Sequence, residues 1–138
     1  MKKNEIQNSA DLFFYKSNSD LNSAKFLLKA IESSEVDIDL ETVMFHLQQS
    51  AEKLLKSILS HNRIKFLKTH DIEELINMCI EKKINLVQNV QYLINLTAYA
   101  VEGRYAIIHD DLNDIYTNIN ILNTLYTKVQ ESINSEKI

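Results

Sequence analysis

The residues most able to do chemistry lie in the stretch EGRYAIIHDD, Glu102 to Asp111. Arg104 and His109 stand five positions apart there, beside the single glycine of the chain, Gly103. An arginine guanidinium can hold a phosphate through two parallel hydrogen bonds, and a histidine can transfer a proton near neutral pH. The pair therefore predicts chemistry at a phosphate. Taken alone, the spacing is a weak signal, and a chance pairing on a connection between helices is the simpler interpretation.

The local sequence around this pair indicates a break between two helices. On one continuous helix, residues five apart are turned about 140° from each other and would not converge on one ligand. Gly103 favours a helix end, and Asp110 or Asp111 would be a good N-cap for the next helix. We therefore expect Arg104 and His109 on a connection and at a helix start, where free backbone N–H groups favour anions.

Other chemistries have little support in the sequence. The four histidines, His46, His61, His70 and His109, form no i,i+4 pair with each other or with a cysteine, so we expect no metal site. His70 is most simply part of a helix start. Cys79 falls on an apolar helical stripe and is expected in the core rather than as a nucleophile. One glycine cannot build a glycine-rich phosphate loop, and no cofactor is expected.

Composition predicts helices. The chain has 138 residues with 45% hydrophobic and 25% charged residues, which suits one domain over residues 1–138. One glycine and no proline leave few residues for tight turns. The expected fold class is all-α, an antiparallel up-and-down bundle of four to five helices.

Charge and hydropathy limit the partners. The net charge is -4 and the isoelectric point is near 5.5, so the chain as a whole lacks the basic surface that broad nucleic-acid binding needs. We expect no DNA binding, whereas a local basic site for RNA stays open. No apolar run approaches the roughly 20 residues of a membrane span, and no signal peptide is seen. With a single cysteine as well, we expect a cytoplasmic protein with no membrane contact.

Five segments carry helical periodicity. They are about Ser9 to Ile31, about Leu40 to Asn62, a third with Thr69 as its N-cap, about Leu86 to Glu102, and a fifth that begins at Asp110 or Asp111. The apolar stripes of these segments are expected to include Leu12 and Phe13 in the first, Ile80 in the third, and Leu112 and Tyr116 in the fifth. Glu52 and Lys56 form an i,i+4 pair away from the core stripe of the second.

The second segment resembles the signature helix of a known family. Its sequence FHLQQSAEKLLKSIL, Phe45 to Leu59, is similar to that of HEPN proteins (higher eukaryotes and prokaryotes nucleotide-binding). DLNSAKFLLKA, Asp20 to Ala30, precedes it in the family's order, and THDIEELI, Thr69 to Ile76, follows. YAVEGRY, Tyr99 to Tyr105, then precedes a final amphipathic helix. The resemblance covers about residues 9 to 130.

The resemblance implies a helical bundle that forms a homodimer. Many HEPN proteins act as toxins beside a minimal nucleotidyltransferase antitoxin. Catalytic members are metal-independent endoribonucleases with an Arg, four to six intervening residues and a His, and their two-fold axis joins both copies of this motif in one composite site. Arg104 and His109 match that spacing and are the expected catalytic residues. Tyr105 and Glu52 are expected to support them, and Tyr105 is the nearest candidate for adenylylation by the partner.

The motif also departs from the catalytic pattern of the family. Tyr105 stands where catalytic members usually carry a polar residue, often Asn, and Ala106 stands where many members without the histidine carry proline. The alternative hypothesis is therefore a non-catalytic HEPN module, which would dock a nucleotidyltransferase or a nucleotide through the same groove.

Overall fold

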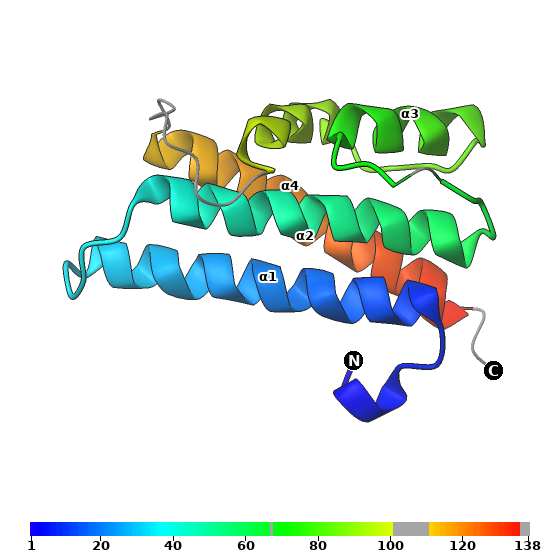
Figure 1. Cartoon of the computed structure of the whole chain (residues 1–138), viewed down its shortest axis with the longest axis horizontal. Coiled ribbons are helices and arrows are strands. Elements are labelled where there is room, and N and C mark those ends of the chain that lie inside the picture. The colour runs from blue at the N-terminus through cyan, green and yellow to red at the C-terminus, as the bar shows by residue number, and fades with distance from the viewer. Residues whose placement is uncertain (67, 101–110, 136–138) are drawn as a thin grey trace.

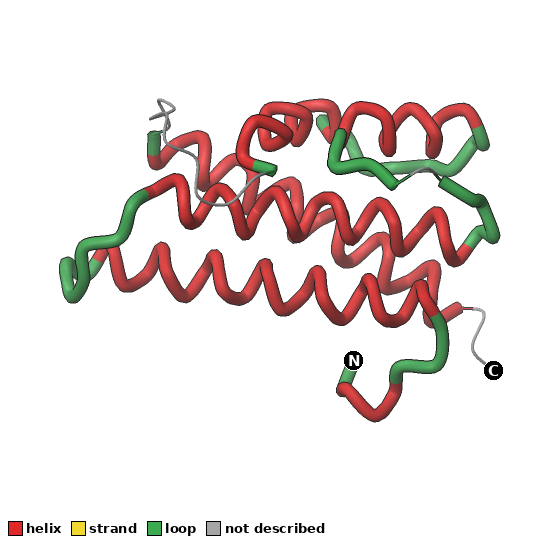
Figure 2. The backbone as a smooth tube through the Cα atoms, in the orientation of Figure 1, coloured by secondary structure: helices red, strands yellow, loops and turns green. Residues whose placement is uncertain are grey.

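The computed structural model describes residues 1–66, 68–100 and 111–135 of the chain. Its regular elements are η1 (Lys3–Glu5), α1 (Ser9–Glu32), α2 (Leu40–His61), α3 (Ile72–Glu81), the 3₁₀ helix η2 (Val90–Tyr99) and α4 (Leu112–Ser135) (Figure 1). No strand occurs in these residues (Figure 2). The expected all-α bundle is confirmed. None of the described helices is both long and apolar enough to cross a membrane.

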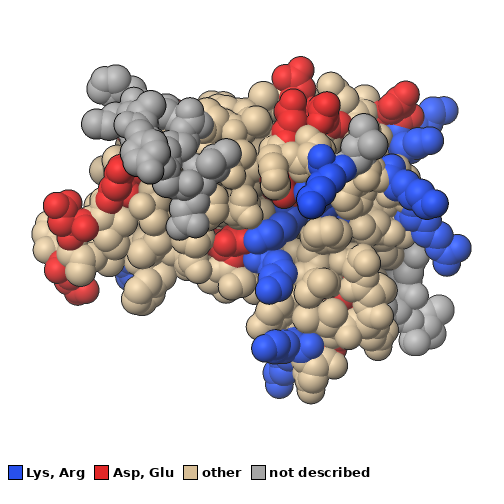
Figure 3. All heavy atoms as spheres, in the orientation of Figure 1, with Lys and Arg blue, Asp and Glu red and all other residues tan. Residues whose placement is uncertain are grey.

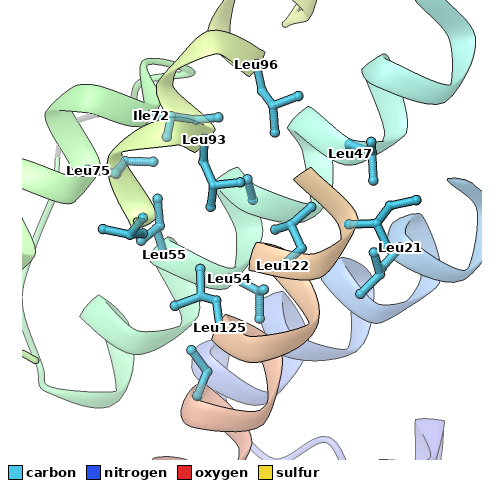
Figure 4. Close-up of a cluster of buried hydrophobic side chains, with 14 of the residues drawn as sticks. Leu21, Leu47, Leu54, Leu55, Ile72, Leu75, Leu93, Leu96, Leu122 and Leu125 are labelled. Atoms are coloured by element: carbon cyan, nitrogen blue, oxygen red, sulfur yellow. The ribbon is translucent and has the colours of Figure 1, made fainter. Parts of the chain in front are cut away.

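Helix α2 is the centre of the bundle. It lies antiparallel to α1 and contacts α1, α3, η2 and α4 (Figure 1). Because neighbours surround it, α2 buries side chains around much of its circumference, as a helix in the middle of a core does. In Figure 4, Leu47, Leu54 and Leu55 of α2 lie among leucines and isoleucines from every other long element: Leu21, Ile72, Leu75, Leu93, Leu96, Leu122 and Leu125.

Helix α1 buries one straight stripe against α2. Apart from Asp11, its buried residues recur at alternating spacings of four and three, which is the repeat of one helix face: Ala10, Phe14, Ser17, Leu21, Ala24 and Leu28. Small residues let the two helices approach closely. Ser17 Oγ donates to the Ser50 carbonyl at 2.7 Å, and Ser57 Oγ donates to the Ala10 carbonyl at 2.8 Å. These bonds satisfy hydroxyl groups that the packing removes from water.

Four side chains that periodicity placed in the core are exposed, so those predictions are wrong. Leu12 is 44% exposed, Ile80 54%, Leu112 39% and Tyr116 39%. Phe14, not Leu12, fills the start of the α1 stripe. An apolar stripe is often wider than the contact it makes, and the sequence pattern does not say which edge of the stripe meets a neighbour.

The helix starts follow capping chemistry, with one correction. Asp71, not Thr69, is the N-cap of α3, since its Oδ1 accepts a hydrogen bond from the Glu73 N–H at 3.0 Å. Thr69 lies two positions earlier, where its hydroxyl accepts from the Asp71 N–H at 3.0 Å. Asp111 Oδ1 accepts from the Asp114 N–H at 2.9 Å and caps α4, as expected for one of the two aspartates.

The fourth predicted segment begins later and is wound more tightly than expected. It is a 3₁₀ helix that starts at Val90 rather than an α-helix from Leu86. Asn89, directly before it, has the left-handed backbone angle φ 65°, which interrupts any helix running in from Leu86. The predicted end at Glu102 lies outside the described residues.

Candidate functional site

The predicted catalytic pair and its neighbour lie in the part of the chain that is not described. Arg104, Tyr105 and His109 all fall within residues 101–110. The structure does place the residues on either side of this segment, which is called the motif segment below. Those flanks decide which elements the motif segment joins.

The residues before the motif segment form the end of η2, which lies at the start of α3. Thr97, near the end of η2, accepts a hydrogen bond from the Ile72 N–H through its Oγ1 at 3.2 Å. Ile72 is the first residue of α3, so its N–H has no partner within the helix. The bond therefore fixes the end of η2 next to the helix start that carries the THDI sequence.

The residue that follows the motif segment, Asp111, caps α4. The first turns of α4 are tied to η2. The Tyr92 hydroxyl donates to Asp114 Oδ1 at 2.7 Å, and Asn95 Nδ2 donates to the buried Asn118 Oδ1 at 3.2 Å. The hydrogen bond to Asp114, and to a lesser degree burial, raises the pKa of the Tyr92 phenol above its ordinary value.

A polar cluster, buried except for His70, links the family-like sequence of α2 to the THDI sequence. Glu52 Oε1 lies 2.9 Å from His70 Nδ1, and Glu52 Oε2 accepts from Lys56 Nζ at 3.0 Å. Gln48 Nε2 donates to Glu52 Oε1 at 3.1 Å and to the His70 carbonyl at 3.3 Å. These four residues, Gln48, Glu52, Lys56 and His70, are called the Glu52 cluster below.

Glu52 stays ionised although it is only 5% exposed. Burial is the largest single influence and acts to raise its pKa, but the hydrogen bonds from Lys56, His70 and Gln48 outweigh it together. The net result is a pKa below the ordinary value. The i,i+4 pair of Glu52 and Lys56 is thus confirmed, but it lies in the interior rather than on a free face.

A second acid–histidine pair lies on another part of α2. Asp20 of α1 holds His46 Nδ1 at 3.1 Å through Oδ1 and Lys53 Nζ at 2.6 Å through Oδ2. The His46 side chain is 27% exposed, against 63% for His70. In the described ranges, no group of three or more His, Cys, Asp or Glu side chains could hold a metal ion.

Cys79 is placed as predicted. Its side chain is fully buried in the core and its thiol is free. Burial raises the thiol pKa to about 12, so little reactive thiolate forms near neutral pH.

These features define an all-helical bundle whose central helix carries buried charges that contact the histidine before α3. A comparison with protein-family models matches residues 10–132 to the HEPN domain. The chain therefore belongs to the HEPN domain family. No significant match was found among curated proteins or among solved structures.

His70 is the functional candidate that reasoning from the sequence missed. It was assigned to a helix start, yet its ring contacts Glu52, eighteen positions earlier in the chain. One signal was present: Gln48, Glu52 and Lys56 repeat at spacings of four along a helix that also carries a long apolar stripe. Such a polar line inside a buried helix requires partners from another element, and a nearby histidine is a suitable one.

Proposed function

We propose that this HEPN protein is a toxin-like, metal-independent endoribonuclease that acts as a homodimer. The observation that carries the proposal is the spacing of Arg104 and His109, with four residues between them, inside a HEPN domain. Two copies of this motif, one from each protomer, would meet in one composite site. The single domain would span residues 1–138 and would act on RNA in the cytoplasm.

The chemistry needs no metal ion. The RNA 2′-hydroxyl attacks its adjacent phosphorus, and the bond to the 5′-oxygen of the next nucleotide breaks, which leaves a cyclic phosphate and a 5′-hydroxyl. Arg104 would hold the phosphate oxygens and stabilise the charge that develops on them. His109 would remove the proton from the 2′-hydroxyl or deliver one to the leaving oxygen.

The surface beside the motif segment supports a dimer there. Tyr92, Leu112 and Tyr116 are three of the seven large hydrophobic side chains that are exposed in the described ranges, at 38%, 39% and 39%. All three lie on η2 or on the first two turns of α4, next to Asp111, where the motif segment ends. Leu112 and Tyr116 are four positions apart and so share one face of α4, and exposed apolar groups on one helix face favour a protein interface.

The supporting roles differ for the two remaining predicted residues. Glu52 is buried and bonds His70, so any effect it has on RNA must pass through His70. Tyr105 would pack or bind beside Arg104. In a pair with a minimal nucleotidyltransferase antitoxin, Tyr105 would be the residue that receives an adenylyl group, which mass spectrometry after co-expression would detect.

The second candidate function is a non-catalytic HEPN module. It would dock a nucleotidyltransferase partner, or a nucleotide, through the surface to which Arg104 contributes. The observation that favours it is Tyr105, which follows the arginine where catalytic members usually have a polar residue.

Cleavage of RNA in the presence of EDTA separates the two functions. The wild type is expected to cut single-stranded RNA and leave cyclic phosphate ends, whereas an Arg104→Ala, His109→Ala double variant should lose at least roughly a hundredfold in rate. Equal degradation by both proteins, or none by either, would rule out the ribonuclease. The double variant, purified in the same way as the wild type, also serves as the control for contaminating nucleases.

A further inference from the structure

The His70 ring is fixed at one nitrogen and open at the other. Nδ1 lies 2.9 Å from Glu52 Oε1, while the side chain is 63% exposed. In the part of the chain that the structure describes, this contact is the one hydrogen bond of the ring. An imidazole whose Nδ1 is held by a carboxylate presents Nε2 in a fixed direction.

The support beneath His70 is unusually costly for a merely structural contact. Glu52 and Lys56 are 5% and 8% exposed, and removing two charges from water carries a desolvation penalty that their mutual attraction only partly offsets. Gln48, which is fully buried, adds a bond to Glu52 and another to the His70 backbone. The Glu52 cluster therefore holds both the ring and the backbone of one exposed residue.

The stretch of chain that leads to His70 is basic, although the whole chain is acidic. Arg63, Lys65 and Lys68 are exposed, and no acidic residue occurs between Asn62 and His70. Figure 3 shows Lys and Arg side chains on the side of the molecule where the connection from α2 to α3 runs, with acidic side chains beside them over α3 and others at the α1–α2 connection. The three exposed cations are called the basic strip below.

Two of the three acidic residues that follow the basic strip are engaged in the start of α3. Asp71 caps the helix through the Glu73 N–H, and Glu74 accepts from the Thr69 hydroxyl at 2.6 Å. Glu73 is an exposed carboxylate in the first turn. In the sequence, His70 therefore stands between three exposed cations before it and an acidic helix start after it.

His70 also lies two residues before the helix start that is bonded to the end of η2. Ile72, two positions after His70, donates its N–H to Thr97. Thr97 stands seven positions before Arg104 in the sequence. A ligand that extends from the motif segment along the α2–α3 connection would meet His70 and then the basic strip.

We propose that His70 and the basic strip form a phosphate-binding subsite for single-stranded RNA, in which His70 Nε2 donates a hydrogen bond to a backbone phosphate. A protonated imidazole donates from both nitrogens, so His70 can bond Glu52 and the phosphate at once. The basic strip holds the neighbouring phosphates by charge. The inference rests on the proposed function in taking RNA as the ligand, and it makes His70 a binding residue outside the Arg–His pair.

The test is binding of a short single-stranded 2′-O-methyl RNA, which cannot be cleaved through its 2′-position. In His70→Asn, the amide nitrogen replaces Nδ1 as the donor to Glu52, but nothing replaces Nε2. We expect fluorescence anisotropy to show RNA affinity reduced roughly tenfold. The slope of log affinity against log salt should fall by about 0.7, the value for one lost phosphate contact on a single strand.

The matched control is His46→Asn, because His46 makes the same kind of Nδ1 contact with Asp20. It should bind RNA like the wild type. Circular dichroism and thermal melting check that both variants fold. Wild-type affinity in a folded His70→Asn protein, or an equal loss in both variants, would overturn the inference.

A measurement on the wild type covers the case in which His70→Asn does not fold. With ¹⁵N-labelled histidine, the Nε2 resonance of His70 should shift as the 2′-O-methyl RNA is added, while that of His46 stays in place. An Nε2 signal that does not move in a protein saturated with RNA, or a wild type that binds no RNA, would refute the subsite.

The two proposals fail in different ways. The ribonuclease proposal fails if the Arg104→Ala, His109→Ala double variant cuts RNA as the wild type does, or if neither cuts. That double variant keeps the Glu52 cluster, so it should still bind the 2′-O-methyl RNA and still show the His70 shift. If it does, the subsite stands whether or not the motif segment is catalytic.

Discussion

At the scale of single residues, Glu52 connects stability to the proposed RNA surface. Its carboxylate is buried, yet it remains charged because Lys56, His70 and Gln48 all donate to it. Each partner is needed, since a buried charge without hydrogen bonds is far more costly than a buried neutral group. Substitutions in this cluster should therefore affect folding as well as the position of His70.

Replacing Glu52 by Gln should lower the free energy of unfolding by about 3 kcal/mol, because Lys56 would remain buried and charged without its partner. Urea unfolding at neutral pH measures the loss. A Glu52→Gln, Lys56→Met double variant is the control, and it should be more stable than Glu52→Gln because it removes the unpaired charge. A double variant that is less stable than the single one would contradict this account.

The free energy of unfolding should depend on pH through the ionisation of Glu52. The folded-state pKa of Glu52 lies below its ordinary value of 4.5, so the stability it contributes is present above that value and is lost as the pH falls through the folded-state pKa. From about pH 5 downward, the wild type should lose stability more steeply than Glu52→Gln. Parallel unfolding curves for the two proteins across this range would argue against it.

Cys79 should be chemically silent in the folded protein. Its thiol is fully buried and its pKa is raised to about 12, so thiolate is scarce and reagent access is blocked. Ellman's reagent is expected to label it at the rate of unfolding in buffer and at once in guanidinium. Rapid labelling of the native protein would show that the core around α3 opens readily.

At the scale of elements, the start of α3 both caps the helix and places His70 against Glu52. Asp71 caps the helix, and the residue before it, His70, turns its ring to Glu52. Because α3 has only 10 residues, its stability depends strongly on its cap and on packing against α2 and η2.

Asp71→Ala should destabilise the protein by about 1 kcal/mol, since the Glu73 N–H would lose its acceptor. Asp71→Asn keeps an oxygen in place and is the matched control, with stability close to that of the wild type. Chemical unfolding measures both variants. If Asp71→Asn loses as much as Asp71→Ala, the charge of Asp71 rather than its capping bond is what matters.

At the scale of the whole molecule, α2 organises the fold and the surface around α4 organises the proposed assembly. Every long element packs on α2, so the bundle has one core in the described ranges. The exposed Tyr92, Leu112 and Tyr116 are not needed for that core. They are therefore available for a second protomer.

Leu112→Glu should weaken the proposed dimer by a factor of roughly ten to a hundred, because the interface would have to bury a carboxylate. Analytical ultracentrifugation measures the change, and RNA cleavage should fall with the dimer fraction. Ile80→Glu is the control, since Ile80 is 54% exposed on α3 rather than near the motif segment. A dimer that survives Leu112→Glu and dissociates with Ile80→Glu would place the interface elsewhere.

Much of the fold could be predicted from the sequence. Helices follow from local features of the chain. These are the near absence of glycine and proline, the periodicity of Met44, Leu47 and Leu54, and the aspartates at the start of the last helix. The family resemblance was also readable in the chain and is confirmed over residues 10–132. Helix phase and boundaries were less certain: Leu12 proved exposed, and η2 began at Val90.

Tertiary structure alone decided the environment of the polar residues. The sequence shows Glu52 and Lys56 four positions apart, which on a surface helix is a minor ion pair. Only the packing of α3 and η2 around α2 buries that pair and brings His70 to it across eighteen positions. Periodicity reports which face of a helix is apolar, whereas the energy of a charge depends on which other elements cover it. The sequence determined the helices and the family, and packing determined that Glu52 holds His70.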